Sequence, residues 1–253
     1  MIDLHSHLLP GVDDGSRSLE QSVQVLHRMA DAGITGICLT PHLTASQAPL
    51  GIPPAYNEAF ERLRAAAPTR VALSRGVELM LDRHLPPEAA ANRELTLGRS
   101  RYLLVEFTRM AAPNAVTRAM GHIAGLGLVP VLAHPERYAC CSPAVAAGWK
   151  SAGALLQVDA NTLFMPRGRG ERARQLLAAG LADILAADNH GDDRSVSGPF
   201  VSLCEQGGEV QAEMLLVKNP AAILADQLTE DVPPLTLRTS FFDRLRQLLD
   251  PEG

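Results

Sequence analysis

The chain opens with two histidines two residues apart, His5 and His7, at the end of a short apolar run. Residues i and i+2 of a β-strand point to the same face of a sheet, so both imidazoles should face one point. Neutral imidazole is the commonest metal ligand in proteins, and the pair therefore predicts part of a metal site. A ligand at position 5 leaves no room for a removable signal before it, and we expect none.

More histidines and carboxylates stand at or beyond the ends of later apolar runs. Alone, each is more often a cap, an ion pair or a surface residue. Together they are hard to explain without metal, because buried carboxylates and imidazoles are costly unless they find partners. With His5 and His7, the predicted ligand set has nine members. The other seven are Asp14, His42, Glu78, Glu106, His134, Asp188 and His190.

The ligand types indicate which metals and which reaction to expect. Imidazole and carboxylate without thiolate suit Zn, Mn or Fe, and nine ligands suit two or three divalent ions. Three such ions carry six positive charges, and the carboxylates of Asp14, Glu78, Glu106 and Asp188 neutralise four of them. The remaining charge matches a phosphate monoester dianion. We therefore expect phosphoester hydrolysis by a hydroxide that bridges metal ions.

Composition narrows the class of protein. The 253 residues are 46% apolar and 20% charged, which suits one large α/β domain. A net charge of −5 argues against nucleic acid as a partner, and no apolar stretch is long enough to predict a membrane span. Four cysteines without a CxxC pair suggest reduced thiols and a cytoplasmic protein. None of them begins the Cys-x₅-Arg motif of a cysteine phosphatase. They are Cys38, Cys140, Cys141 and Cys204.

Seven strand-like runs alternate with helical patterns, which predicts a parallel α/β barrel or a doubly wound sheet. In a parallel barrel the carboxyl ends of all strands meet on one face, where the nine ligands would gather. The strands are expected at Ile2–His5, Ile34–Thr40, Val71–Glu78, Tyr102–Phe107, Leu128–His134, Leu155–Asp159 and Ile184–Asp188. The helices are expected at Leu19–Ala32, Pro54–Ala67, Pro113–Leu126, Pro143–Ala152, Glu171–Ala179 and, near the end, Glu209–Ala225 and Ser240–Asp250. The link Thr229–Thr236, with two prolines, is expected to be a mobile tether.

The motifs around these residues resemble the PHP (polymerase and histidinol phosphatase) family. They are His5-Ser-His7, Asp14-Gly15, Thr40-Pro41-His42, Gly76-Val77-Glu78, Ala133-His134-Pro135 and Asp188-Asn-His190. Within it, the chain is most similar to the CpsB/YwqE/CapC-type metal-dependent tyrosine-protein phosphatases of bacterial capsule and exopolysaccharide systems. Val12-Asp13-Asp14-Gly15, Arg101-Tyr102 and His134-Pro-Glu-Arg-Tyr138 carry that narrower resemblance. It implies a distorted (β/α)₇ TIM-like barrel over residues 1–228. The tail, 229–253, is not covered by the resemblance, and the sequence pattern predicts one helix in it.

The resemblance also implies a role for each site residue. His5, His7, Glu78 and Asp188 would hold one ion, and Glu78, Glu106 and His134 a second. Asp14, His42 and His190 would hold a third. Arg137 and His42 would be required for catalysis, and Arg137 would bind the substrate phosphate. Apart from the resemblance, the loop after His190 offers Arg194 as a second phosphate or substrate contact. The implied partner is a phosphotyrosine-bearing protein such as the tail of a bacterial tyrosine kinase; self-association is left open.

Three alternatives remain at this stage. The same barrel could serve a small phosphorylated metabolite such as histidinol phosphate. An amidohydrolase also begins with His-x-His, but it commonly uses a bridging carbamylated lysine, and Lys150 and Lys218 do not end predicted strands. A non-catalytic scaffold could keep the fold, although the complete ligand set argues against it.

Overall fold

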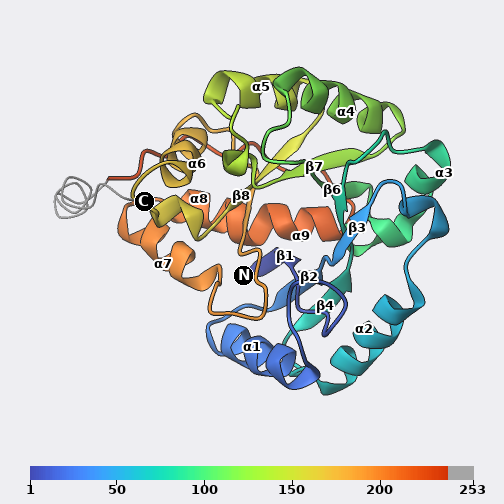
Figure 1. Cartoon of the computed structure of the whole chain (residues 1–253). Coiled ribbons are helices and arrows are strands. Elements are labelled where there is room, and N and C mark those ends of the chain that lie inside the picture. Colours follow the sequence, from blue (N-terminus) through green and yellow to red (C-terminus); the bar gives the residue numbers. More distant parts are fainter. Residues whose placement is uncertain (239–253) are drawn as a thin grey trace.

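The computed structural model describes residues 1–238, so the helix expected at Ser240–Asp250 lies outside the described residues. Nine short strands form a ring that is surrounded by helices (Figure 1). Every strand pair is parallel, as the alternating pattern predicts. The strands are β1 (Ile2–Ser6), β2 (Gly36–Leu39), β3 (His42–Thr44), β4 (Ala72–Arg75), β5 (Glu78–Met80), β6 (Tyr102–Glu106), β7 (Val129–Ala133), β8 (Leu155–Asp159) and β9 (Ile184–Ala186).

At two of the seven predicted strands the structure has two short strands separated by a break of two residues; the first of each pair is called the lower half and the second the upper half. β2 ends at Leu39 and β3 begins at His42, with Pro41 between them, which has no N–H to give to a ladder. β4 ends at Arg75 and β5 begins at Glu78. The lower halves form a sheet in the order β1-β2-β4, and the upper halves start a second sheet in the order β3-β5-β6-β7-β8-β9.

The ring closes where β1 meets the end of β9. Ser6 and Asn189 form a parallel bridge, and the His7 N–H donates to the Asn189 carbonyl at 2.7 Å. If each broken strand is counted once, the ring has seven strands. The prediction of a distorted (β/α)₇ barrel is therefore confirmed.

Local signals explain where most helices begin. The Ser18 hydroxyl accepts from the Gln21 N–H at the start of α1, and Ser142 accepts from Val145 at the start of α5. Prolines occupy the first turns of α2, α4 and α5, as expected. The helices that cover the strands are α1 (Leu19–Asp31), α2 (Pro54–Ala66), α3 (Pro87–Ala90), α4 (Pro113–Gly125), α5 (Pro143–Ser151), α6 (Arg169–Ala178) and α7 (Ser197–Glu205). No helix of the described residues is long and apolar enough to cross a membrane.

The helix predicted over Glu209–Ala225 is present but irregular. It consists of α8 (Glu209–Glu213), a π-helical segment η6 (Met214–Lys218) and α9 (Asn219–Leu224). Pro220 cannot donate to the carbonyl four residues earlier, and the backbone widens into the π-turn just before it. This helix lies across the barrel in Figure 1, and its Ile223 packs with barrel residues such as Leu4 and Ile184. It therefore helps to close the end opposite the carboxyl ends of the strands.

The link Thr229–Thr236 is not the mobile tether that its prolines suggested. Val232 and Leu237 are buried, and the Leu235 N–H donates to the Leu177 carbonyl of α6. Asn219 holds the start of the segment: its amide donates to the Glu230 carbonyl and its oxygen accepts from the Glu230 N–H, both at 2.9 Å. The division of the chain at residue 228 stays a prediction.

Asn219→Ala should lower the free energy of unfolding by about 2–4 kcal/mol, because three hydrogen bonds of a buried side chain are lost and one of their partners, the Asp183 carbonyl, belongs to a buried residue. Urea unfolding measures the change. The control is Asn114→Ala at an exposed position of α4, which should shift stability by less than about 0.5 kcal/mol. Equal free energies of unfolding of the two variants would show that the hydrogen bonds of Asn219 contribute nothing to stability.

Candidate metal centre

Seven of the nine predicted ligands lie at the carboxyl ends of strands or in the loops that follow them, and His42 and Glu78 are the first residues of β3 and β5. The strands themselves supply His5, His42, Glu78 and Glu106, and the other five follow β1, β7 and β9. Four overlapping groups of these side chains bring their nitrogen and oxygen atoms close enough to hold a cation. The three remaining histidines, His27, His84 and His122, are in none of these groups, as expected.

Four side chains form the tightest group. The His5 Nε2 atom is 3.2 Å from His7 Nε2, 3.3 Å from Glu78 Oε2 and 3.2 Å from Asp188 Oδ1. His7 Nε2 is 3.3 Å from each of the same two oxygens. Ligands at tetrahedral corners around an ion, with bonds of roughly 2.0–2.1 Å, would be separated by about 3.3 Å. The spacing of these atoms therefore fits a single divalent ion.

Glu78 lies between this group and a second one. Its Oε2 is 3.1 Å from His42 Nδ1, which is also 3.3 Å from Glu106 Oε1. Its Oε1 is 2.9 Å from His134 Nε2. Glu78 is thus placed to be shared between neighbouring ions, as the family resemblance implies.

A third group lies nearer the surface. Asp14 Oδ1 is 3.3 Å from His42 Nε2 and 3.5 Å from His190 Nε2. The two ring nitrogens of His42 therefore face different groups, one toward Glu78 and Glu106 and the other toward Asp14. The sequence motifs assigned His42 to the Asp14 group alone, and its position between two groups is visible only in the structure.

Further side chains fix the orientation of the ligands, and sequence reasoning missed two of them. His7 Nδ1 is 2.8 Å from Asp13 Oδ2, and His5 Nδ1 is 2.9 Å from Gln157 Oε1. Such contacts hold the ring so that the other nitrogen keeps its lone pair for a metal. The doubled aspartate at positions 13 and 14 was a usable signal for Asp13. Gln157 gave none, because it lies within an apolar strand far from His5 in the sequence.

The backbone is bent where the ligands follow the strands. His134 has a φ of 34° and Asp188 a φ of 49°, the left-handed region that non-glycine residues rarely adopt. Gly15 lets the loop of Asp13 and Asp14 pack closely against His7, because a Cβ at position 15 would lie 2.0 Å from the His7 carbonyl oxygen. A side chain at position 15 would push this loop away from β1.

The electrostatics of the centre call for cations. Burial opposes the charge on Asp188, but His5, His7 and Arg137 hold the pKa of its carboxyl below the usual range. Burial would lower the pKa of His42, yet hydrogen bonds to Glu106 and Glu78 raise it to about 10. Asp188 Oδ1 is buried and receives no hydrogen bond from the described residues. A cation would satisfy this oxygen, so the donor set fits divalent metal.

The two predicted phosphate-binding arginines meet at the outer oxygen of Asp188. Arg137 donates to Asp188 Oδ2 at 2.5 Å and to Asp159 Oδ2 at 2.6 Å. Arg194 lies 3.6 Å from the same Asp188 oxygen and pairs with Asp192 at 2.8 Å. The partners of Arg137 are therefore Asp159 and Asp188.

Other chemistries find no support in the described residues. Lys150 pairs with Asp183 at 2.5 Å, and Lys218 is an exposed residue of η6, so neither lysine fills the bridging place that Glu78 occupies. The cysteines are free thiols, and burial raises the pKa of Cys38 and of Cys141 to about 12. Neither is suited to act as a thiolate nucleophile.

Solved structures resemble this fold. The structure described as YwqE from Bacillus subtilis and CpsB from Streptococcus pneumoniae, unique metal-dependent tyrosine phosphatases, has a TM-score of 0.77 at 25% identity, covering 94% of this chain and 100% of that one. A phosphotriesterase from Mycobacterium tuberculosis, 13% identical with a TM-score of 0.54, covers 84% of this chain and 86% of its own. The second likeness concerns the barrel fold alone.

Comparison with known protein sequences finds the same relatives as comparison with solved structures. Tyrosine-protein phosphatase CpsB of Streptococcus pneumoniae is 28% identical over 247 residues, covering 90% of this chain and 100% of that protein. Tyrosine-protein phosphatase YwqE of Bacillus subtilis (strain 168) is 26% identical and covers 92% and 95%. Residues 1–225 match the family model for capsular polysaccharide synthesis, CpsB/CapC. The chain belongs to the CpsB/CapC family.

Proposed function

We propose that this protein is a metal-dependent phosphomonoester hydrolase whose substrate is a phosphotyrosine-bearing protein of a capsular or exopolysaccharide system. The observation that carries the proposal is the two-sided contact of Asp188. Its Oδ1 faces His5 and His7, the candidate metal ligands, and its Oδ2 faces Arg137 and Arg194. A phosphate dianion needs cations and guanidinium groups at one place, and this arrangement offers both.

We infer that two to three divalent ions, Mn, Fe or Zn, bind at the three ligand groups. His5, His7, Glu78 and Asp188 would hold one ion, Glu78, Glu106 and His134 would hold a second, and Asp14, His42 and His190 would hold a third. Bound ions of this type supply a strong nucleophile from water near neutral pH and positive charge for phosphate oxygens. Contacts of His5 with Glu78 and Asp188 support the first assignment, the contact of Glu78 with His134 supports part of the second, and the contact of Asp14 with His42 supports the third.

The side chains around the ions bind and orient the phosphate. Arg137 presents a planar guanidinium that can bind two phosphate oxygens at once, and Arg194 approaches from the loop that follows β9. Asp159 holds Arg137 in place while phosphate enters. A tyrosine phenolate leaves with a pKa of about 10, so it needs little help from a general acid. His42 is half-buried, and its two ring nitrogens connect the group of Glu106 with the group of Asp14.

We further propose that the physiological partner is a tyrosine kinase with a phosphorylated tail and that the protein works in the cytosol. The relatives named as tyrosine-protein phosphatases support the first point. The free thiols support the second, because reduced cysteines are typical of a reducing compartment.

A panel of substrates tests the proposed activity. The purified protein, loaded in turn with Mn, Fe and Zn, should hydrolyse a phosphotyrosine peptide with a kcat/KM about 100-fold above that for the matching phosphoserine peptide or for histidinol phosphate. Phosphate release measures the rates. Preference for histidinol phosphate under every metal would replace the proposal with the metabolite phosphatase.

Loss of single ligands tests the centre. His42→Ala and Asp188→Ala should each lower turnover of para-nitrophenyl phosphate by more than about 100-fold, since the groups that place charge at the phosphate are lost. His27→Ala, on the exposed face of α1, is the matched control and should keep the wild-type rate. Wild-type turnover by either ligand variant, fully metal-loaded, would refute the assignment.

The orienting role of Asp13 gives a separate prediction. Asp13→Asn should weaken metal affinity by about 10- to 100-fold, because an amide cannot hold His7 Nδ1 in the same way. Competition with a chelator, read by metal content, measures the effect. Asp193→Asn changes the same charge at an exposed site and should leave affinity unaltered. Equal affinities in the two variants would remove Asp13 from the centre.

A further inference from the structure

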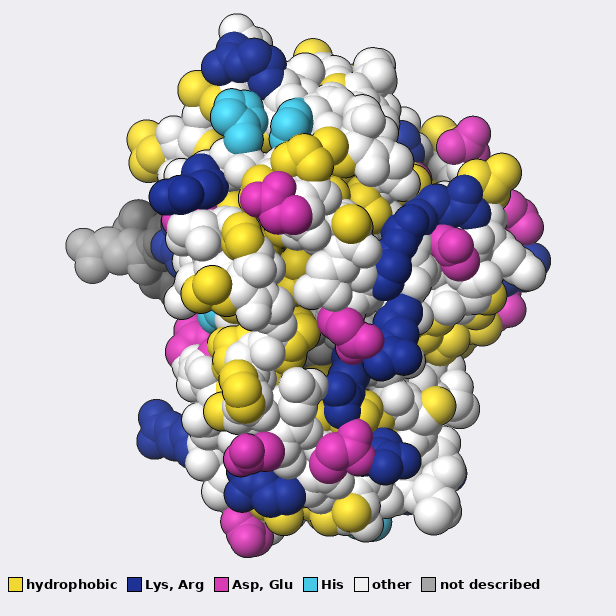
Figure 2. All heavy atoms as spheres, turned by 90° about the vertical axis from the view of Figure 1, so that its right-hand side faces the viewer, with side chains coloured by type: hydrophobic (Ala, Val, Ile, Leu, Met, Phe, Trp, Pro, Cys, Tyr) yellow, Lys and Arg dark blue, Asp and Glu magenta, His cyan; other side chains and the backbone are white. Residues whose placement is uncertain are grey.

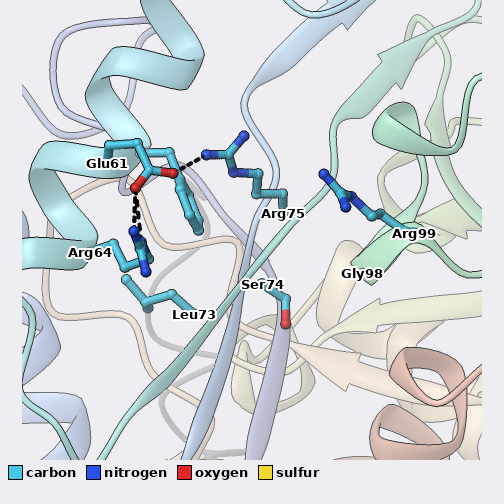
Figure 3. Close-up of a pocket in the computed structure, with 8 residues that line it drawn as sticks. Glu61, Arg64, Leu73, Ser74, Arg75, Gly98 and Arg99 are labelled. Carbon is cyan, nitrogen blue, oxygen red and sulfur yellow. Dashed lines mark hydrogen bonds and ion pairs between the residues drawn. The ribbon is translucent and has the colours of Figure 1, made fainter.

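A groove of about 470 Å³ lies on the outside of the barrel, apart from the metal centre. Its walls come from α2, from β4 and from the 3-10 turn η3 (Leu97–Arg99). Figure 3 shows Arg99 pointing from the η3 side toward Arg75 of β4. None of the nine predicted metal ligands lines it, and the proposed function does not use it. The lining residues are Phe60, Glu61, Arg64, Leu73, Ser74, Arg75, Gly98 and Arg99.

The first feature of the groove is an open strand edge. β4 is the last strand of its sheet and pairs only with β2 among the described residues. The N–H groups of Ala72 and Gly76 donate to carbonyls on the β2 side. Because backbone groups alternate along a strand, the N–H and C=O of Leu73 and Arg75 point the other way, toward the groove. Such an edge is a template for another extended chain.

The second feature is positive charge. Three arginines and one glutamate line the groove, in a protein whose net charge is −5. Figure 2 shows Lys and Arg side chains gathered into a stripe on this face. Glu61 is shared by Arg75, at 2.7 Å, and Arg64, at 2.6 Å. Exposed pairs of this kind are worth little, so an incoming carboxylate can replace Glu61 as a partner.

The third feature is that one arginine is held in place. The Arg75 guanidinium lies 3.8 Å from the centre of the Phe60 ring and also donates to the Asn57 oxygen at 2.8 Å. An arginine fixed in this way loses little conformational freedom when it binds a carboxylate. The groove therefore combines free backbone hydrogen-bonding groups with a preorganised cation.

We propose that this groove binds an extended, acidic segment of a partner protein, which adds as a strand to the free edge of β4. The backbone of the segment pairs with Leu73 and Arg75, and its carboxylates meet Arg64, Arg75 and Arg99. Backbone pairing supplies affinity in this mode, and the arginines supply the preference for acidic sequence.

The position of the groove links it to the metal centre. Arg75 precedes the candidate ligand Glu78 by three residues, and three residues of chain span at most about 11 Å. A segment held along β4 is therefore anchored close to the rim of the centre. The proposal goes beyond the phosphatase activity, since binding at the groove requires neither metal nor turnover.

A labelled short peptide of alternating glutamate and valine is the probe, with the full-length protein. Fluorescence anisotropy should show saturable binding, and a matching lysine and valine peptide should not bind. Arg64→Glu with Arg99→Glu should weaken binding by about tenfold or more. Arg118→Glu, an exposed site on α4, is the control and should bind as the wild type does. Both variants should hydrolyse para-nitrophenyl phosphate at the wild-type rate.

Strand addition has its own readout. Bound peptide should slow amide hydrogen exchange at Leu73 and Arg75, and a peptide with alternate amide nitrogens methylated should lose affinity. Binding that survives methylation without slowing this exchange would reduce the site to ionic contact and overturn the proposal. The proposal would also be overturned if the peptide did not bind, or if the Arg64→Glu, Arg99→Glu double variant bound it with the same affinity as Arg118→Glu. Peptide-independent self-association that the double reversal abolishes would assign the groove to a second copy instead.

Discussion

The carboxylate of Glu78 imposes the constraint on which the rest of the centre depends. It is buried, and four imidazoles crowd around it: His5, His7 and His42 approach one oxygen within 3.3 Å, and His134 approaches the other at 2.9 Å. A buried carboxylate is stable only if positive charge surrounds it. Protons on the histidines or metal ions among them can supply that charge, and metal leaves the imidazoles neutral and able to ligate.

This constraint explains the distortion of the barrel. Glu78 and His42 are the first residues of β5 and β3, the upper halves of the two broken strands. Each break lets the upper half shift toward the second sheet and carry its ligand to the centre. The same break leaves the lower half, β4, without a second neighbour. The open edge and the metal centre thus arise from one feature of the fold.

The candidate ligands could be predicted from the sequence because each is recognisable from its immediate neighbours in the chain. A polar residue that ends an apolar run is visible without a structure, and Glu106 and His134 were identified in this way. The strand breaks, the role of Gln157 and the π-turn before Pro220 were not predicted. The role of Gln157 depends on a contact with His5, which is distant in the chain. Pro41 and Pro220 are visible in the sequence, but a proline alone does not show whether a strand breaks or a helix widens. The helices α3 and α7 are short, and their sequences carry little amphipathic pattern.

Asp188 connects the two kinds of charge in the centre. Its left-handed backbone turns the side chain so that one oxygen faces His5 and His7 and the other faces Arg137. Asp188 is both a candidate metal ligand and the partner of Arg137. Movement of Arg137 therefore changes the electrostatic environment of the Asp188 carboxylate. If Arg137 binds the substrate phosphate, as proposed, its movement leaves the Asp188 carboxylate less neutralised and strengthens the attraction of this carboxylate for a cation. Binding of substrate and binding of metal should then favour each other, because they act through a single carboxylate.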